Sequence, residues 1–507
     1  MAVRWSPVRS EPLARGIGEF LGGPVGRYGL VGTQRRWTPL AVLSAVALAF
    51  LAFAYLYRVP CLSGTNNDGV WSVNWSGSRQ YTATCYNDIV ALYGVEGLED
   101  GHFPYAYSWQ EESGTRYMEY PVATGMFMYL VATVTRAILA VVDLPMPAAS
   151  LYFSIIALVM AFFWVWTVRL VAHLAGNRLW DAVLVAASPL VIVHAFTNFD
   201  ILPIFCVVLA LVWLRERRYI AVGVLIGLGT ALKLWPLFLL GALFTVAVRD
   251  ARAGSGRVAA PWAQFVKPLL AAVVTWLIIN LPIMVAYPAG WREFFRLNTE
   301  RGAEWTTIYQ AINRIFGVNI PIPVLNTLSL ILFAAACAAI FLYGSGLVSR
   351  SAPTASAASA NTSPARILFR PTDLTVTQLM FCITVAFLIT NKVWSPQYSL
   401  WVLPLAALAI PTWWLVYTWA SVEALLWPIL MWHLLGTDNK GLPAWPYTIL
   451  ALVRIGLLIY MVVRVWRGNT GLGAASPTPP SSAQGPVPAS TVGTVPLTST
   501  TQEAPVQ

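Results

Sequence analysis

Residues 37–57, WTPLAVLSAVALAFLAFAYLY, form an apolar segment without a charged side chain. A helix of this length covers about 30 Å at 1.5 Å per residue, which is the thickness of the hydrocarbon core of a bilayer. The whole chain has the same character, since 57% of its 507 residues are hydrophobic and 11% are charged. So few charges cannot cover the surface of a soluble globule. We therefore predict an all-α protein that crosses a membrane many times.

Thirteen apolar segments are candidates for membrane crossing. They lie at residues 37–57, 121–142, 150–172, 180–197, 199–214, 219–235, 236–249, 266–287, 322–347, 374–391, 398–411, 413–435 and 446–465. Arginine and lysine tracts between spans favour the cytoplasmic side. With a cytoplasmic N-terminus, every such tract obeys this rule if residues 121–142 do not cross. That segment begins with Pro121 and carries Arg136 in its middle. We predict a juxtamembrane or re-entrant helix there, about 12 transmembrane helices, and a cytoplasmic C-terminus. A thirteen-span topology is the alternative.

This topology divides the chain into a membrane domain and three cytoplasmic segments. The membrane domain is predicted at residues 37–467, with outer loops at 58–120 and 288–321. A basic cytoplasmic arm precedes it at 1–36, a linker interrupts it at 349–373, and a tail follows at 468–507. The linker and tail are predicted to be disordered because Ser, Ala, Thr and Pro dominate them. The net charge of +10 is explained by positive-inside topology, and no nucleic-acid partner is predicted.

The first outer loop combines carboxylates with aromatic rings. Such a mixture suits a sugar site, where rings stack on the sugar and carboxylates bind or deprotonate hydroxyls, although interfacial aromatic belts look similar. Asp88 stands near the start of a short predicted helix, where a helix cap or a first-turn acid favoured by the helix dipole is the alternative role. Glu119 and Tyr120 end the loop. Cys61 and Cys85 flank part of it, and an extracytoplasmic location would permit a disulfide; the sequence leaves this pairing open.

Several cations lie on the predicted outer side, where topology disfavours positive charge. Lys233 precedes Trp235-Pro236 at the end of a span, and its natural partner is a lipid phosphate, with snorkelling as the alternative. The other polar candidates at outer helix ends are Asp200, Arg292, Arg296, Arg301, Lys392 and Gln397. Arginine forks suit phosphate oxygens. The four histidines are dispersed, and the chain has no Walker, Rossmann or zinc pattern, so we predict no metal or nucleotide cofactor, while a divalent cation is left open.

Four motifs in order make the chain resemble a known family. They are Tyr86-Asn87-Asp88-Ile89-Val90-Ala91-Leu92-Tyr93 through His102-Phe103-Pro104-Tyr105, Glu119-Tyr120-Pro121, Asn198-Phe199-Asp200 through Lys233-Leu234-Trp235-Pro236, and Ser395-Pro396-Gln397-Tyr398. The sequence resembles the GT-C superfamily of polytopic glycosyltransferases and, within it, actinobacterial glycosyltransferase family 87. It departs from the family pattern at Val122, where a second proline is usual, and at Asn198-Phe199-Asp200, which replaces a more usual Gly-Gln.

The resemblance implies an inverting transferase in the bacterial plasma membrane. It would move a sugar, mannose or arabinofuranose, from a polyprenyl-phosphate donor to an envelope glycolipid or polysaccharide on the extracytoplasmic face. Asp88 would be the general base, with Asp200 as a second candidate acid. Lys233 would contact the lipid phosphate, helped by the outer arginines. Glu119, Tyr120, Lys392 and Gln397 complete the expected substrate-binding set.

Two other functions fit part of the pattern. Twelve spans can divide six and six around the basic segment at 249–257, as in a transporter or lipid flippase. The long aromatic and acidic loop, and the lack of repeat similarity between the two halves, argue against this class. A catalytically inactive scaffold with the same fold is the third alternative.

Overall fold

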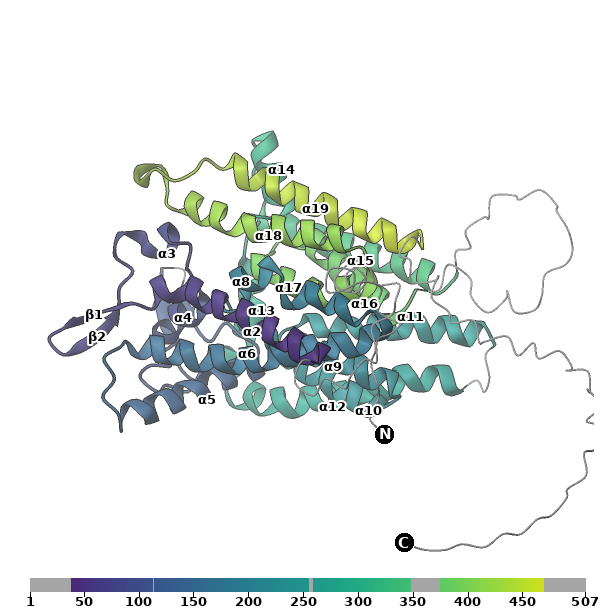
Figure 1. Cartoon of the computed structure of the whole chain (residues 1–507), viewed down its shortest axis with the longest axis horizontal. Coiled ribbons are helices and arrows are strands. Elements are labelled where there is room, and N and C mark those ends of the chain that lie inside the picture. The colour runs from purple at the N-terminus through teal and green to yellow at the C-terminus, as the bar shows by residue number, and fades with distance from the viewer. Residues whose placement is uncertain (1–37, 113, 255–258, 348–373, 469–507) are drawn as a thin grey trace, which may run out of the picture.

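The computed structural model describes residues 38–112, 114–254, 259–347 and 374–468 (Figure 1). The predicted arm at 1–36, the linker at 349–373 and nearly all of the tail at 468–507 lie outside these ranges. The structure is 74% helical, and the prediction of an all-α, multi-pass membrane protein is confirmed.

Seven helices among the described residues are long and apolar enough to cross a membrane. They are α2 (Pro39–Arg58), α5 (Val122–Leu139), α6 (Ala148–Ala175), α12 (Ala259–Ala286), α15 (Ile322–Gly344), α18 (Trp413–Leu434) and α19 (Trp445–Trp466). Shorter helices complete the bundle: α7 (Val183–Ala186), α8 (Pro189–His194), α9 (Ile201–Arg215), α10 (Tyr219–Leu232), α11 (Phe238–Arg252), α16 (Val376–Thr390) and α17 (Ser399–Ala409). The predicted number of about 12 crossings therefore stays a prediction.

One predicted span is broken because a proline interrupts it. The apolar segment at 180–197 forms α7 and α8 instead of one helix. Ser188 caps α8, accepting a hydrogen bond from the backbone of Leu190 at 3.3 Å, and Pro189 occupies the first helical position. Proline has no N–H to donate to the preceding turn, so it suits a helix start and ends the helix before it.

Small residues allow two central helices to pack closely. A Cβ added to Gly223 of α10 would lie 2.3 Å from the carbonyl oxygen of Pro268 in α12, and one on Gly227 would lie 2.5 Å from that of Ala272. The two contacts advance in the same direction, so α10 and α12 run parallel. Glycine at such contacts lets membrane helices approach through their backbones.

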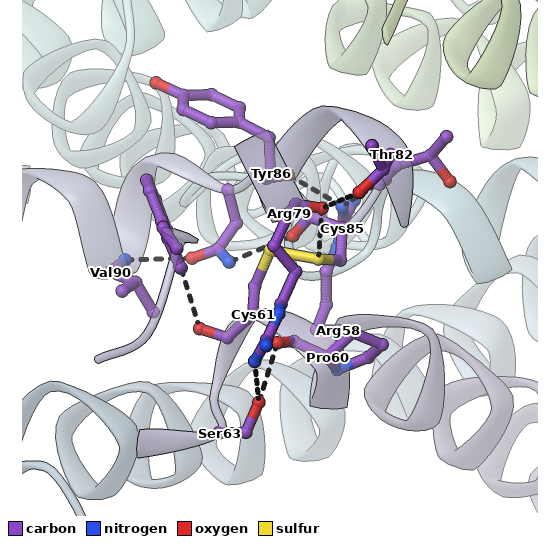
Figure 2. The surroundings of a disulfide bond; sticks show 12 residues. Arg58, Pro60, Cys61, Ser63, Arg79, Thr82, Cys85, Tyr86 and Val90 are labelled. Carbon is purple, nitrogen blue, oxygen red and sulfur yellow. Dashed lines mark hydrogen bonds between the residues drawn. A yellow bond between two sulfur atoms is a disulfide. The ribbon is translucent and has the colours of Figure 1, made fainter. Parts of the chain in front are cut away.

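The elements of the first predicted loop gather at one end of the bundle, which we call the loop end (Figure 1). They are η1 (Val59–Cys61), the hairpin β1 (Gly64–Asn67) and β2 (Val70–Val73), η2 (Ser76–Ser78), α3 (Arg79–Thr82), α4 (Asp88–Val95), and the hairpin β3 (Trp109–Glu111) and β4 (Gly114–Arg116). Both hairpins are antiparallel, pairing Gly64 with Val73 and Trp109 with Arg116. A disulfide joins Cys61 to Cys85 (Figure 2), which answers the question that the sequence left open.

The second predicted loop packs on the first. It forms α13 (Pro288–Glu300) and α14 (Ile308–Phe316). Gly290 lies so close to the backbone of Tyr105 that an added Cβ would be 2.2 Å from its carbonyl oxygen. Arg116 also forms an ion pair with the buried Glu293 at 3.0 Å. The two loops therefore form one layer over the helix ends.

Helix α5 occupies the segment whose crossing the sequence left in question. Near its start, the Thr124 hydroxyl donates to the carbonyl of Leu232 at the end of α10, at 2.7 Å. Beyond its end, Pro147 lies against Gly64 of β1. Helix α5 thus begins at the end of α10 and leads toward the first hairpin, packing along α6 (Figure 1). A re-entrant or juxtamembrane position stays a prediction.

The remaining elements close the bundle. They are η3 (Gly176–Ala182), η4 (Trp235–Leu237), η6 (Pro396–Tyr398) and η7 (Thr437–Asn439). Helices α18 and α19 pack side by side (Figure 1) and share a fully buried ion pair, with Arg454 3.1 Å from Glu423. At the end opposite the loop end, Arg178 pairs with Asp181 at 2.8 Å.

Candidate active site

Asp88 is the first residue of α4 and lies where three segments meet. The helix cap is Asn87, whose side chain accepts from the backbone of Val90 at 2.8 Å. Asp88 is therefore not the cap of α4 but an acid in its first turn, where the helix dipole favours a negative charge, and its carboxylate is available for other contacts. Its backbone N–H donates to the carbonyl of Thr197 at 2.9 Å, and its Oδ2 accepts from the Asn198 amide at 2.7 Å.

The same Asn198 amide nitrogen brings a third segment to the carboxylate. It also donates to the Tyr120 hydroxyl at 2.7 Å. On the other side, the side chain of Tyr86 hydrogen bonds Asp88. The first loop, the segment before α5 and the turn before α9 therefore converge on one half-buried acid.

Burial raises the pKa of the Asp88 carboxyl, against the hydrogen bond from Tyr86 and the positive charge of Lys233. Burial also raises the pKa of Glu119, and the negative charge of Asp88 adds to that effect. Raised carboxyl pKa values bring an acid closer to the range where it can exchange protons near neutral pH.

Lys233 follows the last residue of α10 and points to Asp200. Its backbone is extended, and its N–H donates to Gly229 at 2.8 Å, closing the helix. Its ammonium lies 2.7 Å from Asp200 Oδ1, which also accepts from the Trp401 indole at 2.7 Å. The ammonium is also 4.7 Å from the centre of the Tyr398 ring. Asp200 is 1% exposed, and its Oδ1 is shared by Lys233 and Trp401.

A loop between α13 and α14 adds an acid that sequence reasoning missed. Glu304 accepts a hydrogen bond from the Ser395 hydroxyl at 3.2 Å, and its N–H donates to the Lys392 carbonyl at 2.9 Å. Burial raises the pKa of its carboxyl, while Arg301 opposes the shift and the charge of Asp88 adds to it. In the sequence, the position of Glu304 among the cations of the second predicted loop was the signal that could have identified it. Asn198 was seen only as part of a motif.

Arg301 and Lys392 are two of the cations that the sequence predicted on the outer side. The charge of Arg301 acts on Asp88, Glu119 and Glu304. Lys392 is buried and donates to the carbonyls of Thr299 and Arg301, so it holds the chain that presents Arg301.

Of the two arginines predicted in α13, Arg296 contacts other parts of that helix and the first loop, where it donates to the carbonyl of Thr115 at 3.3 Å. Arg296 is engaged by Glu293 at 2.7 Å and Glu300 at 2.9 Å, and Arg292 is exposed. Neither is brought to Asp88. Gln397 is buried beside Tyr398 in η6.

A cavity of about 500 Å³ adjoins this polar group. Its lining begins at Tyr120 and Leu234 and continues along α12 and α13 to Trp276 and Phe295. Most of the lining side chains are apolar. Within the ranges that the structure covers, no group of three or more His, Cys, Asp or Glu side chains could hold a metal ion.

Comparison with known proteins places these residues in a family. The model of glycosyltransferase family 87 matches residues 120–369, which include Tyr120, Asp200, Lys233 and Arg301. Asp88 precedes the matched region. No curated protein shows a significant match to the chain. The chain belongs to glycosyltransferase family 87 and is a membrane glycosyltransferase.

Proposed function

We propose that the protein transfers mannose or arabinofuranose from a polyprenyl-phosphate donor to a hydroxyl of an envelope glycolipid or polysaccharide. The observation that carries this proposal is the position of Asp88. A half-buried carboxylate with a raised pKa shares one site with Lys233 and Arg301. An acid that can accept a proton, beside cations that can bind a phosphate, meets the two needs of this reaction.

In the proposed reaction, the acceptor oxygen attacks the anomeric carbon of the donor while Asp88 takes the hydroxyl proton. The bond between that carbon and the phosphate oxygen breaks, and the polyprenyl phosphate leaves with the electron pair. Lys233 and Arg301 offset the charge that develops on the phosphate. Attack opposite the leaving group inverts the anomeric carbon. Asn198 and Tyr86 orient the Asp88 carboxylate for this step.

The apolar cavity supports a lipid-linked donor. It starts at Tyr120, whose hydroxyl accepts from the same Asn198 amide that binds Asp88. A polyprenyl chain in this cavity would bring its phosphate to the polar group. Lipid tails are as apolar as this lining, so a polyprenyl chain can pass from the bilayer into the cavity without exposing apolar surface to water.

The disulfide and the distribution of arginines support a site on the extracytoplasmic side of a bacterial plasma membrane. Disulfides persist in oxidising compartments, and Cys61–Cys85 lies at the loop end. Arg178, Arg215 and Arg249 lie near the far ends of α6, α9 and α11, as the positive-inside rule expects of a cytoplasmic face. We propose cytoplasmic N- and C-termini on the same grounds.

The test is sugar transfer in membranes that contain the protein. Polyprenyl-phosphate-[14C]mannose and polyprenyl-phosphate-[14C]arabinose are supplied in parallel, with membranes lacking the protein as the blank. Labelled glycolipid or polysaccharide from one donor is the expected result. Movement of label across the membrane without a glycosyl product would instead support the transporter alternative and overturn the proposal.

A further inference from the structure

Arg58, the last residue of α2, is 0% exposed, and its guanidinium donates to Thr84, Tyr86, Val193 and Thr197, which all lie outside that helix. A basic residue in the last turn of a helix commonly interacts with the helix's own dipole. Here the guanidinium reaches other segments instead. Its environment therefore calls for an explanation beyond helix capping.

One nitrogen of Arg58 holds the segment that leads into α4. Nη1 donates to the carbonyl of Tyr86 at 2.6 Å and to that of Thr84 at 3.5 Å. Tyr86 is two residues before Asp88, and its side chain hydrogen bonds the Asp88 carboxylate. Figure 2 shows Arg58 and Tyr86 around the disulfide at Cys85, which fixes the same segment covalently.

The other nitrogen holds the turn on the opposite side of Asp88. Nη2 donates to the Thr197 hydroxyl at 2.5 Å and to the Val193 carbonyl. The carbonyl of Thr197 accepts the backbone N–H of Asp88, and the next residue, Asn198, donates to its carboxylate. One planar group therefore fixes both segments that supply the partners of Asp88.

An aromatic side chain completes this arrangement. The ring of Trp427 in α18 lies 5.5 Å from the Arg58 guanidinium carbon, and its indole N–H donates to the carbonyl of Thr84 at 2.8 Å. The charge is thus desolvated against a ring, where cation–π attraction is strongest. A lysine has no planar fork and cannot reproduce two divergent pairs of hydrogen bonds.

We propose that Arg58 is a positioning residue that sets the orientation of Asp88 by clamping residues 84–86 to residues 193–197. This inference rests on the proposed function for its catalytic consequence, because Asp88 is the base there. The clamp itself can be tested by a structural measurement that does not depend on sugar transfer.

The first test uses hydrogen exchange of the full-length protein in detergent. In Arg58→Lys, amide exchange should accelerate at least about tenfold in peptides covering residues 84–90 and 193–199, because the Asp88 amide loses its fixed partner. Arg178→Lys is the matched control, since Arg178 likewise donates to a backbone carbonyl far away in the chain, that of Leu408, but lies just after the opposite end of α6. Unchanged exchange in both peptides, or equal acceleration throughout the protein, would overturn the proposal.

The second test uses transfer kinetics with the donor that proves active. Arg58→Lys should lower kcat about 10- to 100-fold with donor KM within about twofold, since a misplaced base affects the reacting step. In an Asp88→Asn background the same substitution should cost less than about twofold more, because the residue that it positions is gone. A full additional loss would contradict action through Asp88. Failure of every lipid-phosphate donor would overturn the proposed function and leave the exchange result standing.

Discussion

At the scale of single residues, Lys233 already has an anionic partner before any substrate arrives. Its 2.7 Å contact with Asp200, which is itself fixed by Trp401, holds the ammonium in one place. A lipid phosphate would therefore meet a preorganised cation, and no side-chain ordering would be needed during the reaction. We therefore expect Asp88 and Asp200 to have different roles in transfer.

Substitution of Asp200 separates those roles. In Asp200→Asn the ion pair is lost, so transfer should fall about tenfold with a raised donor KM, while the acid limb of the pH profile stays where it is in the wild type. The measurement is kcat/KM against pH for both proteins. If Asp200→Asn removed transfer altogether while Asp88→Asn stayed active, Asp200 would be the base.

The raised pKa of Asp88 predicts the pH dependence of transfer. Only the ionised carboxylate accepts a proton, so kcat/KM should fall as the pH drops through a value above the usual aspartate pKa of about 4. Burial is the main cause of the shift. An acid limb at or below pH 4 would contradict this environment for Asp88.

The raised pKa of Asp88 also affects the stability of the fold, which it lowers as the pH rises, whereas transfer is lost as the pH drops. Because folding raises the pKa of Asp88, the protonated form is favoured in the folded state. Its stabilising contribution is present below about pH 4 and is lost as the pH rises through the raised value. Asp88→Asn should therefore unfold at the same or a higher temperature than the wild type at pH 7, as scanning fluorimetry in detergent can measure.

At the scale of elements, the contact between α10 and α12 sets the position of Lys233, which follows α10 directly. Gly223→Ala should destabilise the protein by about 1–3 kcal/mol, because its Cβ would lie 2.3 Å from a backbone oxygen that cannot move freely. Gly241→Ala is the control, since its Cβ would meet only the end of the Ile383 side chain, at 3.4 Å. Thermal unfolding in detergent checks both. Equal effects would show that the close approach is unimportant.

The sequence predicted helices well and their lengths less well. The start of α4 at Asp88 follows from local signals, but Asn87 takes the cap because its amide oxygen reaches Val90. The helix break before Pro189 also has a local cause, but the continuous apolar character of residues 180–197 predicted a single helix. The contacts of Arg58 and Glu304 join segments far apart in the chain. No local pattern predicts such pairs, because side-chain direction depends on the packed bundle.

At the scale of the whole molecule, the site lies between the helix bundle and the layer made by its two large loops. The disulfide, the hairpins and α13 all belong to this layer. The proposed topology places the layer outside the cell, and α5 follows it. The orientation of the molecule in the membrane can therefore be tested without measuring sugar transfer.

Accessibility of the segment after α5 tests that orientation. Asp143 is exposed there, so Asp143→Cys in intact cells should react with a membrane-impermeant maleimide. Arg217→Cys, in the exposed turn between α9 and α10, is the matched control and should react only after the membrane is opened. Labelling of Asp143→Cys only in opened cells would contradict the proposed topology and support a crossing by α5.

Whether Asp88 accepts the proton of the acceptor hydroxyl can be measured by single-turnover transfer with purified protein. With a labelled donor bound, Asp88→Asn should form product at least about 10³-fold more slowly than the wild type while retaining donor affinity within about threefold. Asp68→Asn, at the exposed tip of the first hairpin, should match the wild type. Product formation by Asp88→Asn at a rate close to that of the wild type would show that Asp88 is not the base.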